Sequence, residues 1–293
     1  GSYLLTLRQR GFRDVRYPVF IRRAEHWEGP PVRMLTDAQI GADWVYVPAG
    51  PFMSCGDSGA LEARPAERPT LPGFLIRRLP LSAKDYCDFV NGLHRVDPEA
   101  AWEHVPCSES GVKESGSQYW EKPGVGEQYV VPTVDKDGDP WDPRWPALGI
   151  NWHHAQRCAQ WMSETTGWDV RLPSLHEWEK AARGVDGRIW PWGDRFDSTL
   201  ARIRTSRPGR PQPEPVGAYP TDVSVYGMRD AAGCIRELCG DATFYGNDML
   251  RPVVGASWNH LPDAARCASR LGTSHWNRSP FLGFRLVRGL PGA

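Results

Sequence analysis

The chain has no net charge, no long hydrophobic run and no recognised signal peptide, and each absence excludes a class of protein. Its 35 basic and 35 acidic side chains cancel over 293 residues, so it lacks the overall positive field of a nucleic-acid-binding domain. No stretch approaches the roughly 20 apolar residues that a membrane-spanning helix needs. We therefore expect no nucleic-acid partner, no membrane span and a cytoplasmic location.

Signatures of nucleotide binding, hydrolysis and disulfide bonding are also missing. No Gly-rich loop ends in Gly-Lys-Ser/Thr, and no Gly-x-Ser-x-Gly elbow occurs. Cysteine is odd in number and forms no CxxC pair, which is typical of reduced, buried thiols. The seven cysteines are Cys55, Cys87, Cys107, Cys158, Cys234, Cys239 and Cys267.

Glycine, proline and tryptophan are abundant instead, at 30, 27 and 14 residues. Many aromatic anchors among many chain breakers predict indole packing beneath long irregular connections, rather than a helical bundle or a regular sandwich.

The first 43 residues are predicted to form a separate segment. Residues 3–7 and 15–21 are rich in apolar and aromatic side chains and flank a turn at Gly11, which predicts a β-hairpin. This hairpin resembles the end of the β-sandwich linker repeat found between a bacterial Ser/Thr kinase domain and a C-terminal sensor. The resemblance implies an N-terminal kinase domain as a partner. A second unit, residues 44–293, follows.

Capping residues predict three helices in the second unit. Ser82 caps the first, Asn151 begins the second, which ends at Gly167, and Ser174 with Glu177 forms a capping box for the third.

The intervening region, 94–147, is loop-rich with little periodicity, and residues 223–226 resemble a strand. Asp135, Asp137 and Asp139 crowd together, but Gly138 is misplaced for an EF-hand turn.

The most informative stretch lies near the end, from Gly255 to Val287, with apolar residues at both of its ends. The residues between them show little helical or strand periodicity and are broken by Pro262, Gly272 and Pro280. Their Asn, His, Ser, Trp and Phe side chains contact ligands well and pack poorly. Loops on a rigid frame often carry binding chemistry, so we predict a recognition surface rather than a catalytic one.

Six motifs occur in a characteristic order along the second unit. They are VYVPAG (45–50), GINWHHA (149–155), RLPS to WEKAARG (171–184), PWG (191–193), residues 227–238 and the GASW…GFRL ending. Together they resemble the formylglycine-generating enzyme (sulfatase-modifying factor) family over about 44–288. The resemblance implies an irregular α+β fold of the C-type lectin-like type.

The resemblance does not extend to the copper site of that family. The oxidase binds copper through two cysteines five positions apart, just after the counterpart of residues 255–258, and thiolates suit Cu(I). Residues 259–265 contain no sulfur, and Cys267 matches a later, structural position. We therefore expect no formylglycine-forming activity and no catalytic cofactor.

The resemblance also implies a structural calcium near a Gly-Asn-Val-Trp-Glu-Trp strand. Its counterpart, 233–238, keeps Glu237 but has Cys234 in place of the asparagine. Because calcium prefers hard oxygen ligands, the site is weakened. A carboxylate paired within the protein fits Glu237 at least as well.

Iron enzymes of this fold, the ergothioneine-type sulfoxide synthases, take histidines from an additional helical domain that is not recognised here. His153 and His154 are adjacent, so their side chains point about 100° apart on a helix. His260 and His275 can approach each other across the C-terminal loop, but they lack a third ligand.

The function we predict is non-catalytic recognition of a protein or small-molecule ligand by residues 255–284. The resemblance extends to variable proteins of diversity-generating retroelements, whose adenine-directed mutagenesis of Asn codons cannot produce Lys, Glu, Gln or Met. None of these four occurs between Gly255 and Gly283. The predicted contact residues are Trp258, Asn259, His260, Leu261, Ala264, Ser269, Leu271, Thr273, His275, Trp276, Asn277, Ser279 and Phe281.

Among these residues, Trp276 and Phe281 are the strongest candidates because exposed aromatics dominate binding hot spots. Four arginines, Arg266, Arg270, Arg278 and Arg285, are expected to anchor the segment through carbonyls and carboxylates. Two alternatives stay open: a sensor domain attached to a bacterial Ser/Thr kinase, and a diverged oxidase or iron enzyme completed by another domain.

Overall fold

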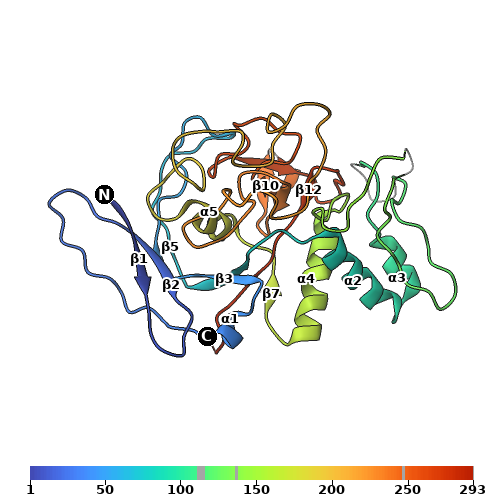
Figure 1. Cartoon of the computed structure of the whole chain (residues 1–293), viewed down its shortest axis with the longest axis horizontal. Helices are drawn as coiled ribbons and strands as arrows, with labels where there is room; N and C mark the ends of the chain where they lie inside the picture. Colours follow the sequence, from blue (N-terminus) through green and yellow to red (C-terminus); the bar gives the residue numbers. More distant parts are fainter. Residues whose placement is uncertain (111–115, 136–137, 246–247, 293) are drawn as a thin grey trace.

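A computed structural model describes residues 1–110, 116–135, 138–245 and 248–292. Two small sheets form its centre (Figure 1). One has the strand order β3-β6-β13-β7, and the other has the order β11-β10-β8-β12 with β9 paired to β10. The strands are β1 (Ser2–Leu7), β2 (Val15–Phe20), β3 (Trp44–Val47), β4 (Gly50–Pro51), β5 (Thr70–Leu71), β6 (Phe74–Arg77), β7 (Val170–Arg171), β8 (Arg236–Leu238), β9 (Thr243–Tyr245), β10 (Asp248–Val254), β11 (Arg270–Thr273), β12 (Leu282–Gly283) and β13 (Val287–Arg288).

The predicted caps begin the three main helices. Ser82 and Asp85 form a capping box, Asn151 accepts a hydrogen bond from the backbone N–H of His154, and Ser174 and Glu177 form a second capping box. These side chains satisfy N–H groups that have no partner within the first helical turn. The helices are α1 (Asp37–Ile40), α2 (Ala83–His94), α3 (Pro98–Glu103), α4 (Trp152–Thr166) and α5 (Leu175–Arg183).

The end of the chain joins the two sheets. Strand β12 pairs in parallel with β8, with Leu282 opposite Arg236, and β13 then inserts between β6 and β7. The segment that precedes β12 is therefore held at both ends by sheet pairing. This arrangement provides the rigid frame that a recognition loop requires.

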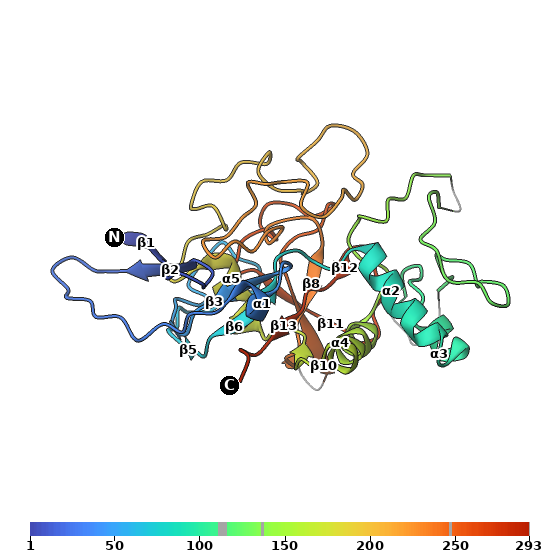
Figure 2. The ribbon, with the colours of Figure 1, turned by 60° about the horizontal axis from the view of Figure 1, so that its bottom comes forward.

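The predicted N-terminal hairpin is confirmed: β1 and β2 pair antiparallel from Ser2–Phe20 to Leu7–Val15. Strand β2 buries Val15, Tyr17 and Val19, whereas β1 is exposed along most of its length. Figures 1 and 2 place the hairpin on one flank of the molecule and helices α2 and α3 on the opposite flank.

The interior is aromatic, as the composition predicts. Trp178 of α5 is fully buried between the sheets, and Tyr86, Phe89 and Phe284 form edge-to-face contacts in the main core. All seven cysteines are buried, as predicted, and each is free. No helix in the described ranges is long and apolar enough to cross a membrane.

Some expectations were wrong or incomplete. Residues 223–226 form a turn with one isolated bridge from Val223 to Arg229, because Ser224 directs hydrogen bonds back to the turn. The loop-rich region contains α3, which Asp97 caps. The C-terminal segment contains β11, which pairs with β10 although Gly272 interrupts its pattern.

Candidate ligand-recognition surface

A close backbone approach fixes the start of the C-terminal segment. Gly255 has φ +67°, and a Cβ there would lie 2.9 Å from the carbonyl oxygen of Ala231 and 3.3 Å from the Trp178 ring. A side chain at this position would therefore clash with backbone and adopt a conformation that L-residues rarely occupy. The chain leaves β10 in a direction set by this glycine.

Beyond Gly255, the segment folds back so that its two ends meet in an aromatic cluster. Trp258 contacts Phe281 with ring centroids 5.1 Å apart, and His260 packs edge-on against Phe281 at 5.8 Å. The Trp258 indole Nε1 donates to the carbonyl oxygen of Pro280 at 3.3 Å. Three of the predicted contact residues are thus brought together and are partly buried.

Trp258 also forms one wall of a pocket of about 200 Å³. The other walls come from the loop-rich region, which supplies Tyr119, Trp141 and Trp145, and from residues 210–213. Ring centroids of Tyr119 and Trp141 are 5.2 Å apart, and those of Trp141 and Trp145 are 6.0 Å apart. A concave site with mostly aromatic and proline walls is typical of a ligand pocket.

The polar groups at this pocket are few. Arg210 forms an exposed ion pair with Asp139 at 2.6 Å. The buried Nε1 of Trp141 has no hydrogen-bond partner among the described residues. Buried N–H groups usually have a partner, so the Trp141 indole is a donor without a partner in the described part of the chain.

A second aromatic cluster lies on α4 and the loop after β11. The ring of His153 lies 4.2 Å from that of Trp276 and 5.2 Å from that of His275. Arg251 places its guanidinium 3.8 Å from the centroid of the neighbouring Trp152 ring. The predicted residues therefore divide into two clusters, one around Trp258 and one around Trp276.

The remaining predicted contact residues differ in exposure. Leu261 is 51 % exposed. Ala264, Ser269 and Ser279 are buried and were wrongly predicted to face a ligand. Ser269, for example, donates to the backbone of Asp263 and accepts from that of Leu61. The others, Asn259, Leu271, Thr273 and Asn277, are partly buried.

Burial keeps the first cluster uncharged at neutral pH. It lowers the pKa of His260 to about 4, with a further contribution from the nearby Arg236 guanidinium. The neutral ring is positioned by the hydroxyl of Ser257, which lies 2.6 Å from Nδ1. The surface around Trp258 therefore presents aromatic rings without a cationic imidazole.

The residues present do not fit the metals of related proteins. Both carboxylate oxygens of the fully buried Glu237 accept hydrogen bonds from Arg285 or Trp178, so this carboxylate is paired within the protein. Cys267 lies in the core, where burial raises the pKa of its thiol. His260 and His275 lie in separate clusters. Among the described residues, no three His, Cys, Asp or Glu side chains are grouped to bind a metal.

The three aspartates at 135, 137 and 139, whose spacing does not match an EF-hand, are only partly described. Asp137 lies outside the described residues. The Asp139 backbone N–H donates to the Asp135 carboxylate at 2.8 Å, and the Asp139 carboxylate pairs with Arg210.

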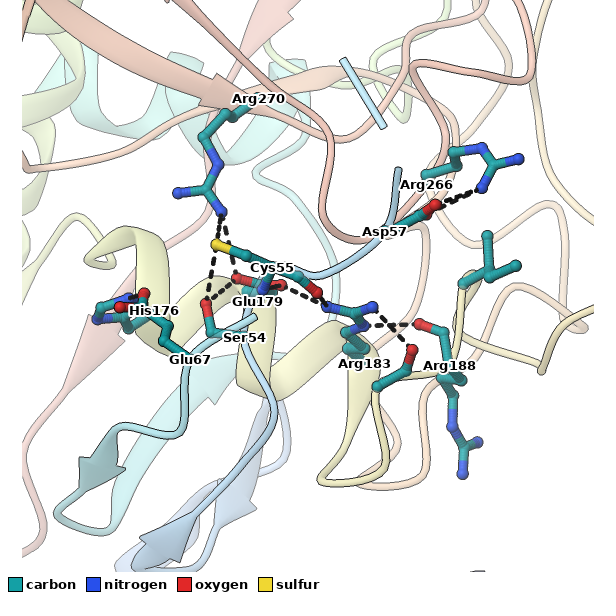
Figure 3. A network of polar contacts seen from close by, with 12 residues as sticks. Ser54, Cys55, Asp57, Glu67, His176, Glu179, Arg183, Arg188, Arg266 and Arg270 are labelled. Atoms are coloured by element: carbon teal, nitrogen blue, oxygen red, sulfur yellow. Dashed lines mark hydrogen bonds and ion pairs between the residues drawn. The ribbon is translucent and has the colours of Figure 1, made fainter. Parts of the chain in front are cut away.

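The four anchoring arginines all point into the fold. Arg266 donates to both oxygens of Asp57, at 2.8 and 2.9 Å, and Arg285 donates to Glu237 and to backbone carbonyls, as predicted. Arg270 pairs with the Glu179 carboxylate at 3.6 Å, as predicted, and also lies 2.7 Å from the Cys55 thiol, while Arg278 lies 3.0 Å from the Cys107 thiol. Figure 3 shows Arg270 and Arg266 approaching the 54–57 turn from the C-terminal segment.

Sequence reasoning missed the pocket walls outside the C-terminal segment. Tyr119, Trp141 and Trp145 lie in the region without periodicity, where no helical or strand pattern indicates the direction of a side chain. Their density of aromatic rings beside proline was the available signal, since loops seldom bury so many rings without a partner.

Comparison with known proteins identifies the family of this chain. Residues 33–290 match the sulfatase-modifying factor enzyme 1-like domain. The chain is 25 % identical to the serine/threonine-protein kinase Pkn1 of Chlamydia trachomatis over 93 % of its length, but spans only 42 % of that kinase. It is 26 % identical to the inactive C-alpha-formylglycine-generating enzyme 2 of Bos taurus, over 84 % of this chain and 87 % of the relative.

Enzymes occur among the relatives too. The hercynine oxygenase of Mycolicibacterium smegmatis is 28 % identical over 72 % of this chain and 46 % of its own length. Kinase-linked, inactive and catalytic proteins thus share this domain.

Solved structures show the same fold at low identity. PvdO from Pseudomonas aeruginosa superposes with a TM-score of 0.62 and 19 % identity, covering 84 % of this chain and 94 % of PvdO. Treponema denticola variable protein 1 superposes with a TM-score of 0.58 and 18 % identity, covering 85 % and 95 %. The α+β fold of the formylglycine-generating-enzyme type is therefore confirmed, and the chain belongs to the sulfatase-modifying factor enzyme 1-like family.

Proposed function

We propose that this chain is a non-catalytic recognition domain whose binding surface centres on the pocket beside Trp258. The observation that carries the proposal is that Trp258, from the C-terminal segment, completes a pocket of about 200 Å³ with Tyr119, Trp141 and Trp145. An apolar cavity with a few polar groups at its edge binds a ligand side chain or ring without needing reactive groups.

Two further observations support a non-catalytic role. Residues 259–265 supply no thiol for copper, and the one cysteine nearby, Cys267, is in the core. The relatives that match most of their own length include inactive formylglycine-generating enzymes. The pocket then serves binding alone.

The ligand class that suits the pocket is a peptide segment with an aromatic or proline side chain. Aromatic walls contribute large contact areas at low entropic cost. The Arg210–Asp139 pair at the mouth is exposed and can contact either sign of charge. A protein or peptide ligand thus fits both the apolar walls and the polar rim.

A displayed library of random peptides provides the test. Peptides enriched on the wild-type chain should bind the Trp258→Ala variant at least tenfold more weakly. Trp27, an exposed indole in the chain after β2 and not part of this pocket, is the control, and Trp27→Ala should bind normally. Equal affinity for Trp258→Ala, or no enrichment on the wild type, would remove the proposal.

An oxidase remains the competing function, since some relatives are enzymes. It requires copper bound to the purified chain and oxygen uptake in the presence of a cysteine-containing peptide. We expect neither, because the copper-binding thiols are absent from the segment.

A sensor linked to a kinase is the second function that a specific observation favours, because the kinase Pkn1 aligns with 93 % of this chain. In such a protein, ligand binding must be transmitted towards the N-terminus. Hydrogen exchange measures this: a library-derived peptide bound at Trp258 should change the protection of β1 and β2. Unchanged protection in the hairpin would contradict a sensing role while leaving recognition intact.

A further inference from the structure

A second cavity, independent of the recognition surface, has a cysteine in its wall. It measures about 450 Å³ and is lined by Cys55, Arg64, Glu67, His176, Asp241 and Arg270, among others. Its residues come from the turn after β4, from the start of α5, from the chain after β8 and from β11. Figure 3 shows Cys55 Sγ facing Arg270, with the His176–Glu67 pair nearby.

The backbone of Cys55 is held in an uncommon conformation. Its φ is +59°, in the left-handed region that few residues other than glycine adopt. The Glu179 carboxylate accepts from its N–H at 2.7 Å, and the Arg183 guanidinium donates to its carbonyl oxygen at 2.6 Å. Two side chains of helix α5 thus hold the backbone N–H and carbonyl groups of Cys55 and fix the direction of its sulfur.

Arg270 supplies positive charge at that sulfur. Its Nη2 lies 2.7 Å from Sγ of Cys55 and 3.6 Å from the Glu179 carboxylate. The Arg270 side chain is only 8 % exposed, yet it lines the cavity. Its Nε and Nη1 make no hydrogen bond to any described residue, so this buried guanidinium presents two unused donors beside the thiol. Donors of this kind stabilise negative charge on sulfur or on an oxygen bound next to it.

The other cysteines do not combine a neighbouring arginine with a position in a cavity wall. Burial raises the pKa of Cys87 to about 11 and raises those of Cys158, Cys234, Cys239 and Cys267 as well. Cys107 contacts Arg278 at 3.0 Å but is fully buried. It is therefore an internal control that has an arginine beside its thiol without a place in the cavity wall.

We propose that Cys55 is a peroxide-reactive thiol and that the cavity admits a small neutral hydroperoxide. Sulfur attacks one oxygen of the peroxide, an S–O bond forms, and the O–O bond breaks. The thiol proton goes to the leaving oxygen, so one thiol and one hydroperoxide give one sulfenic acid and one alcohol, or water from hydrogen peroxide. Sulfur is oxidised and the peroxide is reduced.

The surrounding charges favour an uncharged reactant. Arg64 and Arg270 share the cavity wall with Glu67 and Asp241. The wall thus carries charges of both signs, and it attracts neither an anion nor a cation over a neutral molecule. During attack, negative charge develops on the leaving oxygen, where the free Nε and Nη1 of Arg270 can donate to it. The Ser54 hydroxyl lies 3.5 Å from the sulfur and donates to the Glu179 carboxylate at 2.6 Å.

Competition among the seven thiols of the native chain tests this directly. Hydrogen peroxide is added in the presence of dimedone, which traps sulfenic acids, and the labelled peptides are quantified by mass spectrometry over time. We expect Cys55 to be labelled at least tenfold faster than Cys107 or any other cysteine. Equal labelling of Cys107, or none at Cys55, would overturn the proposal.

Variants then separate reactivity from access. Arg270→Met should slow the labelling of Cys55 at least tenfold. Arg278→Met, the matched change beside Cys107, should leave the labelling rate of Cys55 unchanged. Reaction with neutral N-ethylmaleimide in a parallel sample reports whether the cavity stays open. An unchanged rate of peroxide labelling in folded Arg270→Met would contradict the role assigned to Arg270. If that variant does not fold, the competition among the thiols of the wild-type chain still tests the reactivity of Cys55.

Discussion

Arg285 and Glu237 form a fully buried ion pair that joins the last strand region to β8. Nε of Arg285 lies 2.5 Å from one carboxylate oxygen and Nη2 lies 2.6 Å from the other, and both side chains are 0 % exposed. Trp178 of α5 donates to the same carboxylate at 2.9 Å. Three sequence motifs that lie far apart in the chain thus meet at one carboxylate.

Removal of this carboxylate is expected to be strongly destabilising. Glu237→Ala leaves a buried guanidinium without its counter-charge, and breaking one side of a buried pair costs about 3–5 kcal/mol. Urea unfolding measures the loss. The exposed Lys84–Asp88 pair on α2 is the matched control, and Asp88→Ala should cost far less stability because exposed ion pairs contribute little. Similar losses for the two variants would show that the buried pair does not hold the motifs together.

Calcium should not change the stability of the chain through Glu237. Its oxygens already accept hydrogen bonds from Arg285 and Trp178, so a cation would have to displace a guanidinium. Melting curves in millimolar calcium and in a chelator should coincide. A melting temperature that rises with calcium in the wild type, and not in Glu237→Gln, would place a metal at this carboxylate after all.

The sequence was sufficient for the parts of the fold that follow local rules. Ser82, Asn151 and Ser174 cap helices because their side chains satisfy nearby N–H groups, which is a short-range effect. A carboxylate paired within the protein was one of the two roles considered for Glu237, because the neighbouring asparagine ligand is lost.

Long-range contacts were beyond such rules. Nothing local indicates that Trp258 meets Trp141 and Trp145, or that Arg270 meets Cys55, 215 positions away. Strand β11 was missed because pairing with β10 overrides the weak pattern around Gly272. The buried position of Ser269 likewise depends on the 54–61 loop folding over it.

Truncation of Trp276 tests the second aromatic cluster. The sequence analysis ranked Trp276 among the two strongest candidate contact residues, which predicts that Trp276→Ala weakens ligand binding. Because Trp276 packs 4.2 Å from His153, we now expect an additional loss of about 1 kcal/mol in stability. Library-derived peptides should bind Trp276→Ala at least tenfold more weakly if they span both clusters. Binding impaired by Trp258→Ala alone would restrict the surface to the pocket.

Acid should destabilise the first aromatic cluster through His260. Burial lowers the pKa of His260 to about 4 in the folded chain, whereas an unfolded histidine titrates near 6.5. Above pH 6.5 the ring is neutral in both states, and its contribution to stability is fully present. Between pH 6.5 and 4 the unfolded chain binds a proton that the folded chain excludes, so stability falls with falling pH.

Urea midpoints measured over this range should therefore drop less steeply for His260→Gln than for the wild type. His26→Gln, at an exposed position of the linker, should keep the wild-type slope, and identical slopes for all three chains would mean that the His260 ring is accessible to protons in the folded state.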